Sequence, residues 1–141
     1  MSTATARRGQ APGPTTKARG QAAEALALRY LQSCGLRLVG RNIRSPGRGG
    51  GEIDLIMAEP DGTLVFVEVR QRSRATHGGA AASVGWGKQR RIVWAARHYL
   101  ARLAPMPPCR FDVVVIDGEL RGDPPPRIQW LRAAFDASAW D

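Results

Sequence analysis

The stretch GEIDLIMAEPDGTLVFVEVR, residues 51–70, consists of two apolar runs on either side of the turn sequence EPDGT. Pro-Asp-Gly suits a tight hairpin turn in which Gly62 takes the left-handed conformation. The pattern therefore predicts two antiparallel strands, and three acidic residues lie inside them: Glu52, Asp54 and Glu68. A charge in a buried strand is costly unless a partner compensates it, so we expect an ion pair, an ion or a ligand here.

The expected register of this hairpin decides which side chains face each other. A three-residue loop at 60–62 places Asp54 opposite Glu68 and Glu52 opposite Arg70. One interpretation is a cross-strand ion pair of Glu52 with Arg70, with the other two acids exposed. However, like charges directly opposite each other are destabilising. The alternative is a divalent cation between Asp54 and Glu68, because Mg²⁺ is typically held by one or two carboxylates.

Composition limits the class of protein. The chain has 141 residues, of which 43% are hydrophobic, and a formal net charge of +9. This length suits one domain, and no apolar stretch is long enough to span a membrane. No secretory signal is visible, so we expect a cytoplasmic protein with two reduced, mostly buried thiols, Cys34 and Cys109. The basic charge favours a polyanionic partner, most commonly nucleic acid.

Apolar periodicity and turn residues predict the order of elements. Residues 1–19 lack periodicity and are expected to form a disordered basic tail, so that 20–141 make a single domain. Beyond the hairpin, the polar and Gly-rich residues 71–83 are typical of a mobile loop. The order α-β-β-β-α-β predicts an α/β fold with one mixed sheet flanked by helices. The expected helices are 20–34, 86–103 and 133–140, and the expected strands outside the hairpin are 36–43, 111–116 and 128–131.

A basic surface is expected beside the acids. Arg70, Arg72 and Arg74 alternate along the chain that leaves Glu68, and four basic residues share one sector of the helix at 86–103. An ordinary solvated helix face is the alternative interpretation. Trp86 and Trp94 are further candidates for stacking on unpaired bases, although Trp94 also suits a packed position. The residues expected to bind phosphates are Arg70, Arg72, Arg74, Lys88 and Arg91.

Several segments together resemble a known family. GEIDLI, VFVEVRQR, the helix-start Lys88, RFDVVVI and the closing AAF look like the YraN family of small uncharacterised bacterial proteins, over residues 20–135. That family is similar in motif to the restriction-endonuclease-like PD-(D/E)XK nuclease superfamily, which includes archaeal Holliday-junction resolvases. The resemblance implies a restriction-endonuclease-like αβββαβ core and an Mg²⁺- or Mn²⁺-dependent endonuclease acting on DNA, branched or otherwise structured. Those resolvases act as homodimers, although no stretch here identifies a dimer face.

The resemblance also implies roles for individual residues. Asp54 matches the metal-binding aspartate of the superfamily, and Glu68-Val69-Arg70 matches its (D/E)-X-K element. Glu68 would then be the second metal carboxylate, and the Val69 carbonyl a third protein oxygen. Glu24 matches an acidic position that some relatives place near the metal, and an ordinary solvated helix glutamate is the alternative.

One residue departs from the nuclease pattern, because Arg70 stands where catalytic members usually have Lys. Arginine cannot act as a base, although it can bind phosphate bidentately. The candidate bases are then a metal-bound hydroxide or Glu52, and Lys88 could supply the missing ammonium. Two competing hypotheses follow: a non-catalytic nucleic-acid-binding module on the same fold, and an adaptor whose basic face recruits an acidic protein. The expected catalytic set is Asp54, Glu68, Arg70, Lys88 and Glu52.

Overall fold

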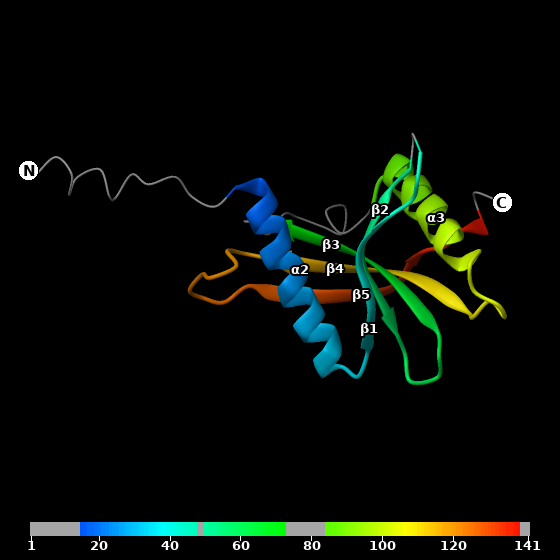
Figure 1. Cartoon of the computed structure of the whole chain (residues 1–141). Coiled ribbons are helices and arrows are strands. Elements are labelled where there is room, and N and C mark those ends of the chain that lie inside the picture. The colour runs from blue at the N-terminus through cyan, green and yellow to red at the C-terminus, as the bar shows by residue number, and fades with distance from the viewer. Residues whose placement is uncertain (1–14, 48–49, 73–83, 139–141) are drawn as a thin grey trace, which may run out of the picture.

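The computed structural model describes residues 15–47, 50–72 and 84–138. They form two helices and five strands in the expected α-β-β-β-α-β order, followed by one more strand (Figure 1). The elements are α2 (Thr16–Ser33), β1 (Arg37–Arg44), β2 (Glu52–Ala58), β3 (Leu64–Arg72), α3 (Trp86–Leu100), β4 (Cys109–Asp117) and β5 (Arg127–Phe135).

The strands form a single mixed sheet in the order β1-β2-β3-β4-β5. Only β3 and β4 are parallel, and α3 connects them, whereas the other neighbours are antiparallel. Parallel neighbours need a crossover connection, which explains why a helix separates β3 from β4 in the sequence. The predicted α/β class with a flanked mixed sheet is confirmed.

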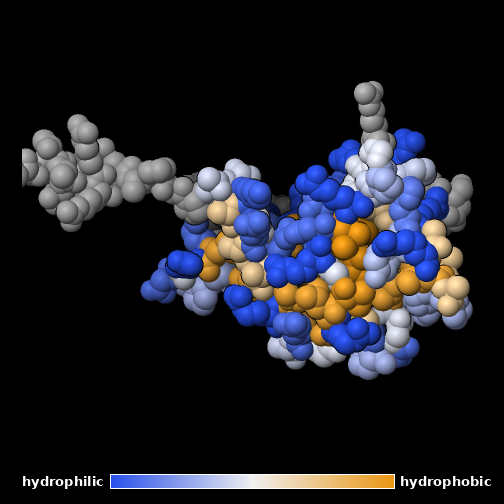
Figure 2. Space-filling model, in the orientation of Figure 1, coloured by the Kyte–Doolittle hydropathy of each residue, from blue (hydrophilic) through white to orange (hydrophobic). Residues whose placement is uncertain are grey.

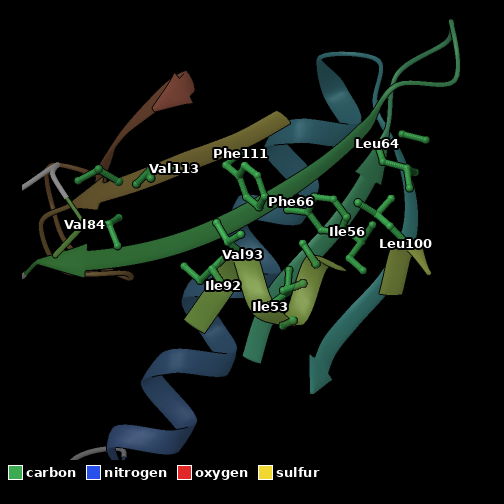
Figure 3. Packing of buried hydrophobic residues seen from close by; sticks show 14 residues of the cluster. Ile53, Ile56, Leu64, Phe66, Val84, Ile92, Val93, Leu100, Phe111 and Val113 are labelled. Atoms are coloured by element: carbon green, nitrogen blue, oxygen red, sulfur yellow. The ribbon is translucent and has the colours of Figure 1, made fainter. Parts of the chain in front are cut away.

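The helices pack on opposite faces of this sheet, and β4 shows how the sequence achieves it. Val113 and Val115 belong to the hydrophobic cluster under α3 (Figure 3), while Val114 and Ile116 belong to the cluster under α2. Successive strand residues point to opposite faces, so a strand that is covered twice reads as a continuous apolar run. The run FDVVVI therefore marks the centre of a three-layer α/β/α arrangement.

Helix α2 begins earlier than its apolar periodicity predicts. Thr15 caps the helix, and its hydroxyl oxygen accepts a hydrogen bond from the Ala18 N–H at 3.0 Å. Residues 16–19 therefore belong to the helix and not to the expected tail, of which residues 1–14 lie outside the described residues. A threonine N-cap satisfies an N–H group that the first turn leaves unpaired, which favours this earlier start.

The C-terminal segment differs from its prediction. Residues 133–135 are part of β5, so the start of the short helix expected at 133–140 is wrong, while 139 and 140 lie outside the described residues. Phe135 stacks on Phe111 of β4 with ring centroids 5.1 Å apart, and Ala133 has a left-handed φ of 49° at a register shift between these strands. These contacts depend on packing against β4, so local propensity does not reveal them.

The surface also corrects one expectation. Cys34 and Cys109 are both exposed, although buried thiols were expected. In the view of Figure 2, hydrophobic residues gather between α2 and α3 with hydrophilic residues around them. Within the described residues, neither helix is long and apolar enough to cross a membrane.

Candidate functional site

The acidic residues of the hairpin lie where β2 and β3 separate. The predicted register is confirmed along the paired part, which ends at Leu55 and Val67. One residue further, the Oδ2 atom of Asp54 accepts a hydrogen bond from the backbone N–H of Val69 at 2.8 Å. The Asp54 side chain thus takes the place of a ladder hydrogen bond, and this position brings it beside Glu68.

Glu68 is the buried acid of this site, with 3% of its surface exposed. Burial raises its pKa to about 8, and the hydrogen bond and negative charge of neighbouring Asp54 act in the same direction. Lys88 opposes this rise: its Nζ atom reaches from the first turn of α3 to within 2.6 Å of Glu68 Oε2. The sequence assigned Lys88 to replace a missing ammonium, and the structure brings that ammonium to the expected carboxylate.

Glu24 approaches the same acids from α2. Its pKa is raised to about 7, first by burial and then by the charges of Asp54 and Glu52, and its side chain shares a hydrogen bond with Asp54. The Nδ2 group of Asn42 donates a hydrogen bond to Glu24 Oε1 at 2.9 Å. Glu24 is therefore an associated member of the acidic cluster and not an ordinary solvated helix glutamate.

Asn42 is a site residue that the sequence did not reveal. It lies in β1 with a left-handed φ of 49°, between the ladder pairs Arg41–Leu55 and Ile43–Ile53. Asparagine tolerates this conformation better than most residues, which was the only available signal. The irregular backbone turns its amide toward Glu24.

Glu52 has a different partner from the one predicted. It lies opposite Arg44 of β1, with Oε2 3.3 Å from the arginine Nε. Glu52 thus pairs with Arg44 across β1 and β2, whereas one interpretation of the sequence paired it with Arg70 across the hairpin, where the β2–β3 ladder ends before either residue. Glu52 still adds negative charge that raises the pKa of Glu24.

A glycine fixes the distance between α3 and the hairpin. A Cβ atom on Gly51 would lie 2.6 Å from the carbonyl oxygen of Arg91, far inside van der Waals contact. Only glycine lets the α3 backbone pack so closely on the start of β2. Since Lys88 lies one turn before Arg91, this close approach helps to hold its ammonium near Glu68.

A hollow of about 260 Å³ opens beside the carboxylate of Glu68. It is lined by residues 68–71 of β3, by Val84 and Gly85, and by Lys88 of α3. Arg70 therefore lines the same hollow as the buried acid and Lys88. This arrangement places one carboxylate and two cationic side chains around a space that a phosphate group can enter.

Two side chains of this site, Asp54 and Glu68, are suitable ligands for a hard divalent cation. Asp54 and Glu68 offer carboxylate oxygens whose mutual repulsion raises the Glu68 pKa, and such oxygens are the preferred ligands of Mg²⁺ and Mn²⁺. In the described part of the chain, no three His, Cys, Asp or Glu side chains converge as a metal site. Val69 contributes its N–H to Asp54, and a role for its carbonyl stays a prediction.

The expected phosphate-binding residues separate into groups. Lys88 and Arg70 line the hollow, and Arg91 is exposed on α3. Arg72 forms a short ion pair with Asp117 of β4, which raises the arginine pKa and ties its guanidinium to the sheet. Arg74 lies outside the described residues.

Comparison with known proteins identifies relatives along most of the chain. The model of the uncharacterised protein family UPF0102 matches residues 23–116. A UPF0102 protein of Polaromonas naphthalenivorans is 65% identical over 126 residues, which cover 88% of this chain and 82% of the relative. UPF0102 proteins of Albidiferax ferrireducens and an Acidovorax species are 64% and 60% identical, covering 87% and 92% of this chain and 91% and 93% of theirs. The family resemblance carried by GEIDLI, VFVEVRQR and RFDVVVI is thereby confirmed, and the chain belongs to the UPF0102 family.

Proposed function

We propose that this protein is a metal-dependent endonuclease that acts on DNA, branched or otherwise structured, in the cytoplasm. The observation that carries the proposal is the surroundings of buried Glu68. Its carboxylate lies beside the acidic side chain of Asp54, and the Lys88 ammonium is 2.6 Å from its Oε2 atom. Raised carboxyl pKa values beside a hollow are typical of functional sites.

Each residue has a role that follows from its position. Asp54 and Glu68 would hold Mg²⁺ or Mn²⁺, which would polarise a phosphoryl oxygen and lower the pKa of an attacking water. Lys88 and Arg70 line the hollow and would hold the scissile phosphate and stabilise its developing charge. Glu52 and Glu24 would add negative charge at the rim, and Glu52 is the candidate protein base.

Cleavage kinetics test this proposal. Branched and single-stranded DNA would be incubated with Mn²⁺ and either wild type or an Asp54→Ala, Glu68→Ala double variant. We expect the rate to fall by roughly 10²–10³-fold or more in the double variant. Asp61→Ala is the matched control, because Asp61 is an exposed acid in the hairpin turn, where it accepts a hydrogen bond from Thr63 N–H. Wild-type rates in the double variant would refute the proposal.

A non-catalytic nucleic-acid-binding module is the second candidate. It is favoured by Lys88, which already forms an ion pair with Glu68 without a metal, and by Arg70 at the usual lysine position. This function predicts salt-dependent DNA binding that is indifferent to Mg²⁺ and to Asp54→Asn. A strict requirement for a divalent metal in binding would exclude it.

A further inference from the structure

The outer surface of α3 differs from an ordinary solvated helix face. Its sequence, WGKQRRIVWAARHYL, contains no acidic residue. Ile92, Val93, Ala95, Ala96 and Leu100 are buried against the sheet, so the opposite side of the helix faces solvent. A regular helix advances about 100° per residue, and this places one aromatic and cationic set on the solvent side. The set, which we name the outer α3 face, is Trp86, Arg90, Trp94, Arg97 and His98.

The two tryptophans of this face are strongly exposed. Trp86 is 68% exposed and Trp94 is 49% exposed, and within the described residues the only other large hydrophobic side chain with comparable exposure is Met106. Trp94 and His98 make an edge-type ring contact with centroids 5.2 Å apart, which helps to hold the indole in place. Large apolar rings held at a surface are typical of interaction sites.

The spacing of the rings suits a stacked strand. Eight residues separate Trp86 from Trp94, which corresponds to about 12 Å along the helix axis and about 80° around it. Bases in a stacked strand are about 3.4 Å apart, so the interval spans three to four stacking steps. Arg90 and Arg97 lie at angles between the two rings, where guanidinium groups can contact the phosphates that link the stacked bases.

We propose that the outer α3 face is a stacking platform for unpaired bases of a single nucleic-acid strand. Aromatic rings interleaved with cations bind such strands without reading sequence, because every base has a π-face. Duplex DNA hides its base faces and can offer only phosphates to the arginines. Gly85, the residue before Trp86, lines the hollow, so the platform begins beside it in the chain. The inference rests on the proposed nuclease function and adds that the substrate contains an unpaired segment. Binding of that segment to the outer α3 face needs no metal.

Metal-free binding measurements test the platform. A fluorescent oligothymidylate and a blunt duplex of equal length would be titrated by anisotropy in EDTA at fixed salt. Wild type is expected to prefer the single strand, and Trp86→Ala and Trp94→Ala are each expected to weaken its binding about five- to a hundredfold. Binding of the duplex should change less than twofold. Trp→Phe at either position should retain most of the affinity, since phenylalanine still stacks.

Matched controls separate stacking from charge. Arg29→Ala removes an exposed arginine from α2, on the opposite face of the sheet, and is expected to leave single-strand binding unchanged beyond the small effect of net charge. Arg90→Ala should weaken both ligands and reduce the salt dependence of binding. Thermal melts of each variant check folding, which exposed indoles should hardly affect.

Two outcomes would overturn the inference. Equal affinity of wild type for single strand and duplex would show that no base stacking occurs, and unchanged single-strand binding by both tryptophan variants would show that the outer α3 face is not the platform. Because these titrations contain no metal, they are independent of cleavage. Loss of nuclease activity in Asp54→Ala with intact single-strand binding would support both proposals, whereas single-strand binding without any cleavage by wild type would support the platform and refute the nuclease.

Discussion

Two buried carboxylates lie on the neighbouring parallel strands β3 and β4, and they differ in the charge and hydrogen-bonding groups around them. Glu68 is 3% exposed and Asp112 is fully buried. Asp112 is surrounded by donors, whereas Glu68 has an acidic neighbour and a raised pKa of about 8. The cost of burying a charge is therefore met by the fold at Asp112 and only partly met at Glu68.

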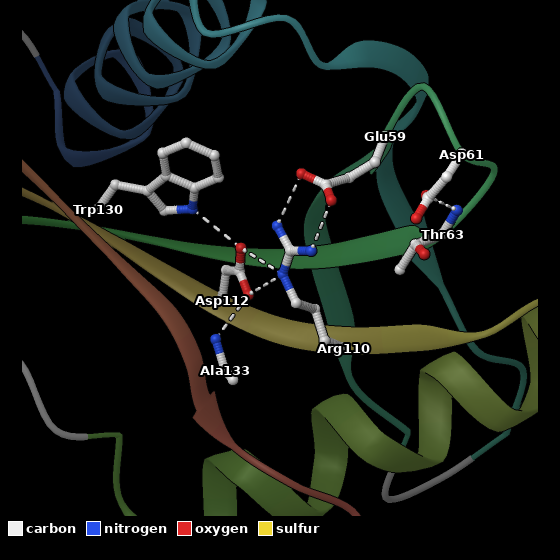
Figure 4. A network of polar contacts seen from close by, with 7 residues as sticks. All are labelled: Glu59, Asp61, Thr63, Arg110, Asp112, Trp130 and Ala133. Atoms are coloured by element: carbon white, nitrogen blue, oxygen red, sulfur yellow. Dashed lines mark hydrogen bonds and ion pairs between the residues drawn. The ribbon is translucent and has the colours of Figure 1, made fainter.

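The Asp112 network is closed (Figure 4). Its carboxylate accepts hydrogen bonds from Arg110 Nε at 3.0 and 3.2 Å, from Trp130 Nε1 at 2.9 Å and from the Ala133 N–H at 2.9 Å. Arg110 in turn pairs with Glu59 at 3.1 Å, which links β4 to the hairpin. These contacts join β4, β5 and the hairpin turn, so Asp112 stabilises the sheet and has little capacity left for a ligand.

The carboxylate of Glu68, by contrast, is not surrounded by hydrogen-bond donors of the fold among the residues that the structure describes. Its cationic partner is Lys88, whose side chain is 54% exposed and can move away into solvent. Its other neighbour, Asp54, repels it when both are ionised. A buried acid in this situation binds either a proton or a cation, which is the physical reason to assign function to Glu68 and structure to Asp112.

The largest expected effect is on the closed network. Asp112→Ala leaves the Trp130 and Ala133 N–H groups and the Arg110 guanidinium without their acceptor. We expect the free energy of unfolding to fall by about 3–5 kcal/mol, as measured by urea denaturation. A loss below about 1 kcal/mol would show that the network is not structural and would remove the contrast with Glu68.

A smaller loss is expected where α3 meets the start of β2. Gly51→Ala introduces a methyl group 2.6 Å from the Arg91 carbonyl oxygen, so the helix must shift. We expect a cost of about 1–3 kcal/mol in unfolding free energy and reduced activity as Lys88 moves from Glu68. Gly20→Ala is the control, because its Cβ meets nothing within 4 Å and it lies within α2, where alanine favours the helix. Equal stability of the two variants would show that this close contact is not needed.

Neutralising Glu68 tests the comparison directly. In the metal-free protein at pH 7, Glu68→Gln should change the unfolding free energy by no more than about 1 kcal/mol, because the amide resembles the protonated acid that the site favours. The same isosteric change at Asp112, Asp112→Asn, turns an N–H donor toward other donors and should cost about 3 kcal/mol. Denaturation curves of both variants in EDTA give the answer, and equal losses would contradict the account.

The stability of the metal-free protein should depend on pH with a defined sign. The pKa values of Glu24 and Glu68 are raised in the folded protein to about 7 and about 8, so the folded state binds more protons than the unfolded state between about pH 4.5 and 8. Unfolding free energy should therefore fall as the pH rises through this window. Acids with lowered pKa values, such as Asp117, act in the opposite sense only at lower pH.

Urea midpoints at a series of pH values, in EDTA, measure this slope. A Glu24→Gln, Glu68→Gln double variant should flatten it, and added Mn²⁺ should reduce it in wild type. A slope that is flat or rising in the metal-free wild type would contradict raised pKa values at the site.

Much of the fold could be predicted from local sequence. The Pro-Asp-Gly turn fixed the register of β2 and β3, and the run FDVVVI indicated a strand covered on both faces. The strand expected at 128–131 lies within β5, but its extension through 133–135 could not be predicted, because those residues are held in β5 by contacts with β4 and not by their own propensity.

The geometry of the site could be derived from the sequence where one hairpin defines it, whereas Lys88 and Glu24 were named as site residues without their contacts. Asp54 and Glu68 meet because their register is local, but the partner of Glu52 depends on β1, whose alignment with β2 cannot be derived from a turn. The Glu24–Asn42 contact joins a helix and a strand 18 residues apart and was missed for the same reason. Asp112 was missed despite a usable signal, since a lone acid inside FDVVVI raises the same question as Glu68.

The most direct test of the central claim is a calorimetric titration of Mn²⁺ into wild type, Asp54→Asn and Asp112→Asn. The account predicts one Mn²⁺ site in wild type, its loss in Asp54→Asn, and its retention in Asp112→Asn at any temperature where that variant stays folded. Absence of Mn²⁺ binding in wild type, with DNA present or not, would mean that Lys88 alone compensates Glu68 and that the Glu68 carboxylate is not a metal ligand.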